Sequence, residues 1–211
     1  MDIYASDDEK GEEIKQWWRD NGRAVIIGIV FGVSLLYSGR YWLNYQTSLA
    51  EQASLSYQQV ATLLTEDKKV EADEKTQLLL SEFSSTPYAV FAAFDMAKKT
   101  AELNDNETAK TYLQWIIDNA ELSGHQALAQ LRLSELLLTE SKFDPALALV
   151  TQPTIVSFTS LYAELKGDIL VAQGKDSEAR LAYQTAMMTL GQGEPRQSIL
   201  QLKLDDVAIP E

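Results

Sequence analysis

The sequence of 211 residues predicts an all-α fold, in which a single N-terminal transmembrane helix is followed by a solenoid of helical hairpins. Three observations lead to this prediction. Residues 24–39 form an apolar run without a charge. After residue 45, Ala, Leu, Glu, Gln and Lys dominate and no window shows the alternation of a strand. In the same part, glycine, alanine and aromatic residues recur at a fixed spacing.

Aromatic and basic flanks complete the apolar run. Tryptophan and tyrosine are typical of both membrane interfaces, and arginine can extend its guanidinium to the headgroups. The residues expected at the interfaces are Trp17, Trp18, Arg23, Arg40, Tyr41 and Trp42. We therefore expect a span over residues 22–43, about 33 Å long at 1.5 Å per residue. A leader of residues 1–21 precedes it, and a domain of residues 44–211 follows.

Two other interpretations of the apolar run remain open. A buried helix of a soluble protein would be equally apolar, but it would not usually carry arginine and tryptophan at both ends. A cleaved signal peptide needs a small-x-small site, and Ser48-Leu49-Ala50 has that form. That site lies far beyond the run, however, and the leader is long and acidic. A retained anchor is the favoured prediction.

The positive charges predict the orientation of this anchor. Lys10, Lys15, Arg19 and Arg23 precede the apolar run, whereas Arg40 is the one basic residue between that run and Lys68. Basic residues stay on the cytoplasmic side, so the N-terminus is expected in the cytoplasm. In a Gram-negative bacterium the large domain would then lie in the periplasm. Within the span, Gly28 and Gly32 form a GxxxG pair that could admit a second helix, although glycine is also simply common in membrane helices.

The clearest repeat unit covers residues 160–190. Gly167 lies within its first helix, Gly174 at the turn, and the second helix has one face at spacings of four and three: Ala179, Tyr183 and Ala186. This pattern resembles a tetratricopeptide repeat, with Ala163 in place of the usual tryptophan. The alternative is an ordinary helical bundle whose alanines fall at these positions by chance.

Further copies precede this unit. Ser134, Ser141 and Ala146 match Gly167, Gly174 and Ala179, and Ala97, Asn104 and Ala109 match them again. The extra residues between these two copies are expected in a loop at Ser123-Gly124. Residues 48–84 fit the pattern poorly, with a second helix expected over 72–83. Stacked hairpins share one core and leave a concave face that normally binds peptides or proteins.

Composition excludes much of catalytic chemistry. The chain has no cysteine and one histidine, and its net charge is −13. Thiolate chemistry and thiolate metal sites are therefore absent, and a nucleic-acid binder would need a basic face. His125 is interpreted as a solvated or capping residue, and residues 191–195 as a loop without a phosphate-binding motif. The acidic stretch 66–74 is a solvated turn or, alternatively, a docking patch. We expect no enzyme activity, no cofactor and no metal.

The order of these segments resembles the YfgM family, the ancillary subunit of the Sec translocon. The resemblance covers essentially the whole chain. It rests on the leader motif EEIKQWWR (residues 12–19), the glycine-bearing span, Arg40-Tyr41-Trp42, residues 165–168 with Gly174, and Ala179-Arg180. It implies an inner-membrane protein beside SecYEG that associates with the periplasmic chaperone PpiD and helps to pass exported unfolded chains to periplasmic chaperones. It also implies a link to the response regulator RcsB, which would be reached through the leader.

Two functions follow as expectations. The first is a translocon-associated chaperone or scaffold that binds through the concave face. The second is an envelope-assembly or cell-division scaffold that uses the same kind of face. Between Arg40 and Thr86 there is neither glycine nor proline, so the membrane helix is expected to continue into the first helix of the domain. The alternative is a hinge at residues 44–48.

Overall fold

The computed structural model describes residues 7–153, 155–191 and 193–207, and every regular element in these ranges is a helix. The all-α prediction is confirmed. The chain divides into two compact units, Met1–Leu49 and Ala50–Glu211. Helix α1 (Asp7–Thr65) contributes to both units, because its last part lies beyond Leu49.

Within the first unit, α1 is the apolar helix that the composition predicted. Among the described residues it is the one helix long and apolar enough to cross a membrane, judged by length and composition. Its large apolar side chains are exposed: Ile27, Phe31 and Leu36 have relative exposures of 68%, 65% and 72%. The helix is also continuous over residues 44–48, the alternative hinge. There the Thr47 hydroxyl donates a hydrogen bond of 2.9 Å to the carbonyl of Leu43, one turn earlier.

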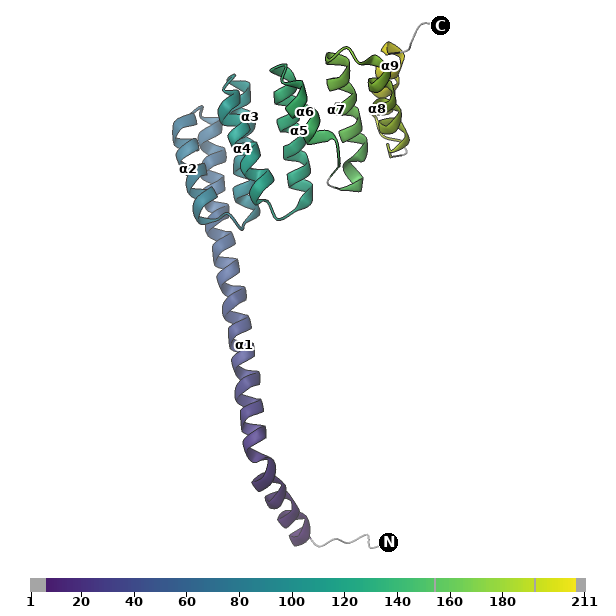
Figure 1. The fold of residues 1–211 in the computed structure, drawn as a ribbon. Coiled ribbons are helices and arrows are strands. Elements are labelled where there is room, and N and C mark those ends of the chain that lie inside the picture. Colours follow the sequence, from purple (N-terminus) through teal and green to yellow (C-terminus); the bar gives the residue numbers. More distant parts are fainter. Residues whose placement is uncertain (1–6, 154, 192, 208–211) are drawn as a thin grey trace. The chain divides into compact units, whose positions relative to one another are not determined.

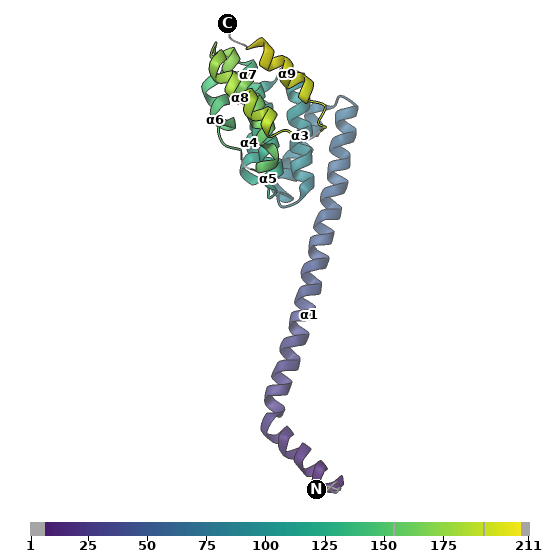
Figure 2. The ribbon, with the colours of Figure 1, turned by 90° about the vertical axis from the view of Figure 1, so that its right-hand side faces the viewer.

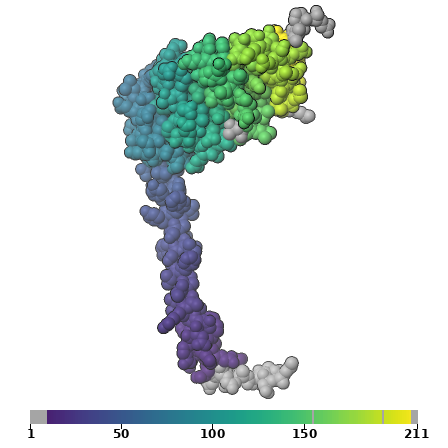
Figure 3. Space-filling view, viewed as in Figure 1, coloured from purple at the N-terminus to yellow at the C-terminus, as the bar shows by residue number. Residues whose placement is uncertain are grey.

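The second unit is a row of short helices that follow one another along the chain (Figure 1). In the space-filling view they form one continuous body (Figure 3). After α1 they are α2 (Lys69–Glu82), α3 (Pro87–Glu102), α4 (Asn106–Asn119), α5 (Ser123–Thr139), α6 (Phe143–Val150), the 3₁₀ turn η1 (Val156–Phe158), α7 (Thr159–Ala172), α8 (Asp176–Met188) and α9 (Gln197–Asp206).

Four hairpins of this unit share one turn geometry. The first hairpin joins the end of α1 to α2, and the others join α3 to α4, α5 to α6 and α7 to α8. Each turn has one residue with a left-handed backbone: Asp67 (φ 57°), Asn104 (φ 60°), Ser141 (φ 58°) and Gly174 (φ 73°). Its N–H donates to the carbonyl three residues earlier, and the following N–H donates to the carbonyl five residues earlier. This is the Schellman arrangement, which satisfies the last carbonyls of the first helix.

The same spacing around each turn defines the core. Seven residues before the left-handed position lie Val60, Ala97, Ser134 and Gly167, and all four are buried. Five residues after it lie Ala72, Ala109, Ala146 and Ala179, each with 0% exposure. Residues 48–84 therefore contain a true copy of the repeat, which the sequence pattern alone left in doubt. Its second helix starts at Lys69, three residues before the expected start.

Gly167 shows why the fourth hairpin needs a glycine. A Cβ built on Gly167 would lie 2.5 Å from Cδ1 and 2.9 Å from Cζ of Tyr183. The ring of Tyr183 thus packs directly on the backbone of α7, and its hydroxyl donates a 2.8 Å hydrogen bond to Asp168. Ala186 is also fully buried in this hairpin.

The expected loop at Ser123-Gly124 was wrong. The connection between α4 and α5 is residues 120–122, and Ser123 and Gly124 form the first turn of α5. The additional residues lengthen the helix, since α5 has 17 residues and α7 has 14. A glycine is tolerated there because the first turn of a helix has N–H groups without intrahelical partners.

The last helix closes the solenoid. Arg196 and Lys203 both contact Glu164 of α7, at 2.7 Å and 2.9 Å, and Lys203 also lies 2.7 Å from Asp168. The two carboxylates raise the pKa of Lys203 against the opposing effect of burial, so it stays protonated. Leu200 of α9 is fully buried against the α7–α8 hairpin. Helix α9 therefore covers the apolar surface of the fourth hairpin, which would otherwise be exposed to solvent.

Candidate functional site

A hollow with a mostly apolar lining lies in the second unit between α3 and α5, the first helices of the second and third hairpins. Its volume is about 700 Å³. The apolar lining comes from Phe91, Phe94, Ala97, Leu128 and Leu136. We call this hollow the α3–α5 groove.

Aromatic rings run along one end of this groove. Phe91 lies at its centre, with ring centroids 6.0 Å from Tyr57 of α1, 6.2 Å from Tyr88 and 5.9 Å from His125 of α5. Phe91 is 38% exposed, so its ring is available at the surface. These residues come from three hairpins and meet because α1, α3 and α5 follow one another as the first helices of successive hairpins.

A hydrogen bond fixes Tyr57 in this cluster. Its hydroxyl donates to Oδ2 of Asp95 at 2.9 Å. Burial, together with the hydrogen bond to the Asp95 carboxylate and its charge, raises the pKa of Tyr57 to about 12. The phenol therefore stays protonated and remains a donor at neutral pH. The aromatic cluster is therefore held in place by the Tyr57–Asp95 hydrogen bond as well as by apolar packing.

Charged groups of both signs form the rim of the α3–α5 groove. Lys98 and Arg132 lie beside Glu102 and Glu135. Arg132 is already paired with Glu135 at 2.9 Å, and Lys98 lies 3.9 Å from Glu102. An apolar floor with a mixed polar rim is suited to binding an extended segment that carries apolar side chains. The rings provide contact area, and the rim gives no strong preference for one sign of charge.

His125 lies inside this arrangement. Its ring meets Phe91 edge-on and Phe94 edge-on, with centroids 5.9 Å and 6.4 Å apart. The interpretation as a solvated or capping residue did not anticipate these contacts. Among the described residues, no group of three His, Asp or Glu side chains is placed to hold a metal ion.

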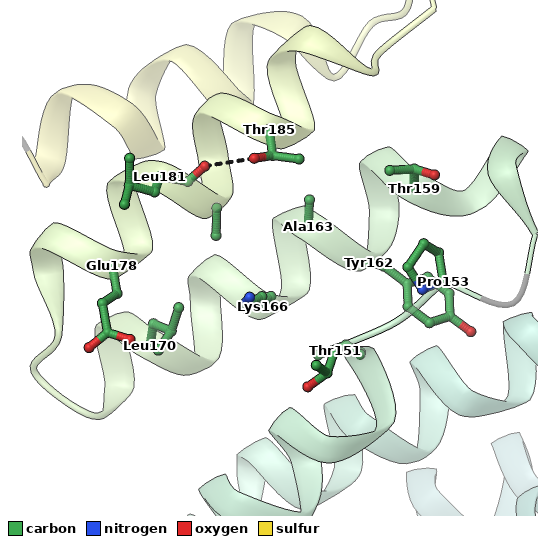
Figure 4. A pocket seen from close by; sticks show the side chains of 12 residues that line it. Thr151, Pro153, Thr159, Tyr162, Ala163, Lys166, Leu170, Glu178, Leu181 and Thr185 are labelled. Atoms are coloured by element: carbon green, nitrogen blue, oxygen red, sulfur yellow. Dashed lines mark hydrogen bonds between the residues drawn. The ribbon is translucent and has the colours of Figure 1, made fainter.

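A second, smaller cavity of about 300 Å³ lies where α6 ends (Figure 4). Helix α6 has 8 residues, whereas α2 and α4 have 14 and α8 has 13. Thr151 and Pro153 follow α6 on one side of the cavity, and Glu178, Leu181 and Thr185 of α8 line the other. Pro153 cannot donate to a helical ladder, which suits an early end of α6. The cavity is thus a consequence of the short helix.

The acidic stretch 66–74 makes contacts within the chain. Asp67 pairs with Lys99 of α3, and Asp73 accepts a 2.6 Å hydrogen bond from Tyr112 of α4. The basic residue Lys69 of the same stretch pairs with Asp105 at 2.7 Å. These groups link the first hairpin to the second, so they serve packing between hairpins.

The residues expected at the membrane all lie on α1. Trp17, Trp18, Arg23, Arg40, Tyr41 and Trp42 are exposed there. A Cβ built on Gly28 or Gly32 would have no neighbour within 4 Å, so the face of the GxxxG pair is open in this chain. Its role in contacting another helix stays a prediction.

Comparison with known proteins identifies the family. The sequence matches a family model described as a tetratricopeptide repeat-like domain over residues 15–209. The chain belongs to this tetratricopeptide repeat-like family. The match begins in the leader and includes the apolar part of α1, so the family is defined by the helix and the solenoid together.

Curated relatives cover nearly the whole chain. A Haemophilus influenzae protein is 29% identical over 98% of this chain and 100% of its own length. Proteins from Escherichia coli and Neisseria gonorrhoeae are 27% and 28% identical, over 99% and 98% of this chain and the whole of each relative. All three are named ancillary SecYEG translocon subunit. The resemblance found in the sequence is confirmed, and these relatives support a role associated with the Sec translocon.

The sequence missed most of the α3–α5 groove. Tyr88, Phe91 and Phe94 were not singled out, although they lie at spacings of three along α3. The left-handed Asp67 was also missed. Asp and Asn tolerate this backbone conformation, so an Asp with alanine five residues later was the available signal.

Proposed function

We propose that this chain is a membrane-anchored ancillary subunit of the Sec translocon, and that its α3–α5 groove binds exported unfolded chains before they pass to periplasmic chaperones. The observation that supports the proposal most is the full-length similarity to proteins named ancillary SecYEG translocon subunits. The groove adds an open apolar surface of a size suited to a few side chains. We propose a binding role and no catalysis.

The proposed topology is single-pass. Residues 1–21 are cytoplasmic, residues 22–43 cross the bacterial inner membrane, and residues 44–211 are periplasmic. The excess of basic residues before the apolar run supports this orientation. Protease added outside spheroplasts should remove the large domain and leave a small protected N-terminal fragment. A soluble mature protein that starts near Glu51 would contradict a retained anchor.

The proposed partners are SecYEG, the periplasmic chaperone PpiD and, through the leader, the response regulator RcsB. The last two come from the family resemblance. Each is testable by purification of the detergent-solubilised protein with its bound partners. Recovery of cell-wall synthases in place of Sec subunits would favour the envelope-assembly scaffold.

The groove is tested by crosslinking in living cells. A photoreactive residue at Phe91 should crosslink to translocating chains, because this ring lies at the open centre of the aromatic cluster. The matched control is Thr111, which is exposed on α4, the second helix of the same hairpin. Equal yields at the two positions would reject the groove as the binding site.

A binding assay gives the expected size of the effect. Phe91→Ala should weaken the binding of an unfolded model peptide about tenfold, since a lost aromatic contact is worth about 1.5 kcal/mol. Fluorescence anisotropy of a labelled peptide measures this change. The control Thr111→Ala should leave the affinity unchanged.

A further inference from the structure

The first turns of α1 carry two separate stripes along one helix. Ile14, Trp17 and Trp18 lie at i, i+3 and i+4, so they share one face, and they are exposed at 68%, 54% and 52%. The stripe ends at polar residues on both sides, with Lys10 one turn before Ile14 and Asn21 one turn after Trp17. We call it the leader apolar stripe.

The opposite face is polar throughout. Glu12, Gln16, Arg19 and Arg23 follow one another at steps of four, three and four, and all four are exposed. Charges of both signs are present, so this part of the helix is not simply a basic arm. The leader helix is amphipathic, with an aromatic face and a polar face, and this is typical of a helix that lies in a membrane interface.

Helix α1 also bends within the first unit. Figure 2 shows that α1 changes direction near its N-terminal end. In the sequence, Asn21 and Gly22 lie between the leader apolar stripe and the apolar run of residues 24–39, and both residue types weaken a helix. The side-chain amide of Asn21 donates to the carbonyl of Trp17 at 3.1 Å and competes with the backbone for that acceptor. The ring of Trp18 covers Gly22, since a Cβ there would lie 3.3 Å from Nε1 and Cε2 of Trp18.

Asn21 and Gly22 lie at the start of the apolar span. A straight helix would carry Ile14, Trp17 and Trp18 out into water, away from the bilayer surface. A change of direction between the leader and residues 24–39 would let the leader apolar stripe lie against the membrane, because both segments belong to the same helix. Tryptophan prefers the interfacial region, where its ring is apolar and its N–H can meet a headgroup or water.

We propose that residues 7–21 form an in-plane helix on the cytoplasmic surface of the bilayer, with the leader apolar stripe inserted into the lipid interface. The occupant of this face is therefore the bilayer itself and not a protein. The proposal rests on the transmembrane anchor proposed above. It adds that the leader is a membrane-bound element with a fixed rotation about its axis, so that Glu12, Gln16 and Arg19 face the cytoplasm.

Site-directed spin labelling tests this arrangement on the full chain. The protein has no cysteine, so every introduced cysteine is unique. Ile14→Cys labels the apolar stripe, and the matched Gln16→Cys labels the polar face two residues later. The labelled protein is placed in nanodiscs of phosphatidylethanolamine and phosphatidylglycerol. Collision rates with oxygen, which is enriched in lipid, and with a nickel chelate, which stays in water, are then measured.

The expected result is a several-fold lower nickel collision rate at position 14 than at position 16, with higher oxygen access at position 14. Equal and high nickel access at both positions would overturn the in-plane helix. Leu36→Cys, within the span, separates the two proposals. Nickel protection at position 36 without protection at position 14 rejects the in-plane helix alone, whereas free nickel access at position 36 rejects the anchor as well.

Discussion

The fourth hairpin and the first hairpin reach the same geometry with different residues. In the fourth, Gly167 faces the large ring of Tyr183, and Gly174 supplies the left-handed turn. In the first, Val60 takes the position of Gly167, Thr76 that of Tyr183 and Asp67 that of Gly174. A small residue on the first helix goes with a large one on the second, and a larger residue goes with a smaller one. The hairpin therefore requires a filled space between its helices and not a particular residue.

The largest effect is expected from overfilling the fourth hairpin. Gly167→Leu should lower the free energy of unfolding by about 3 kcal/mol, because the new side chain would overlap the buried ring of Tyr183. Thermal or urea unfolding of the purified protein measures it. The matched control is Gly124→Leu, since a Cβ at Gly124 has no neighbour within 4 Å. An unchanged midpoint for Gly167→Leu would show that this close contact does not form.

The comparison also predicts a partial rescue. Gly167→Ala with Tyr183→Leu recreates the Ala97 and Leu113 pair of the second hairpin. The double variant should be more stable than Gly167→Ala alone by about 1 kcal/mol, because the smaller Leu leaves room for the added methyl group. A double-mutant cycle of unfolding free energies checks this coupling. Strict additivity would mean that the two positions do not share one space.

A smaller effect is expected at the turns. Gly174→Ala should cost about 1 kcal/mol, because an L-residue with a Cβ is strained in the left-handed region. The reciprocal change Ser141→Gly should raise stability by about 0.5 kcal/mol for the same reason. Urea unfolding midpoints measure both changes. A gain in stability for Gly174→Ala, or a loss for Ser141→Gly, would contradict the equivalence of the two turns.

The smallest effect concerns an ion cluster between the second and third hairpins. Lys110 and Lys142 hold the pKa of Glu140 at about 2, below the 4.5 of an unperturbed glutamate. A lowered carboxyl pKa stabilises the folded state above the unfolded value and loses that contribution as the pH falls through the folded value. Glu140→Gln should therefore flatten the loss of stability between pH 4.5 and pH 2, measured by thermal unfolding. If Glu140→Gln and the unchanged protein had the same pH profile, the ion pairs of Glu140 with Lys110 and Lys142 would not contribute measurably to stability.

The sequence predicted the helices, the apolar segment and the best repeat because those depend on local pattern. Gly167, Gly174 and Ala179 lie within one hairpin, and their spacing follows from one turn. The first hairpin was harder to recognise, because Val60 and Asp67 do not resemble the glycines that do the same work in the fourth. The early end of α6 was not predicted, although Pro153 lies three residues after its last residue, Val150. The α3–α5 groove could not be read from a single window, since Tyr57, Phe91 and His125 meet only after three hairpins have stacked.

The ties between hairpins bear on the order in which this protein can fold. The hydrogen bond from Lys203 to Glu164, which attaches α9 to α7, spans 39 residues, and that from Tyr57 to Asp95 spans 38. Both contacts join residues fewer than 40 positions apart in the sequence, so the entropic cost of closing each loop is small. Each hairpin can form on the previous one as synthesis proceeds, starting from the end of α1. The chain is thus suited to vectorial folding, with α9 as the last part to dock.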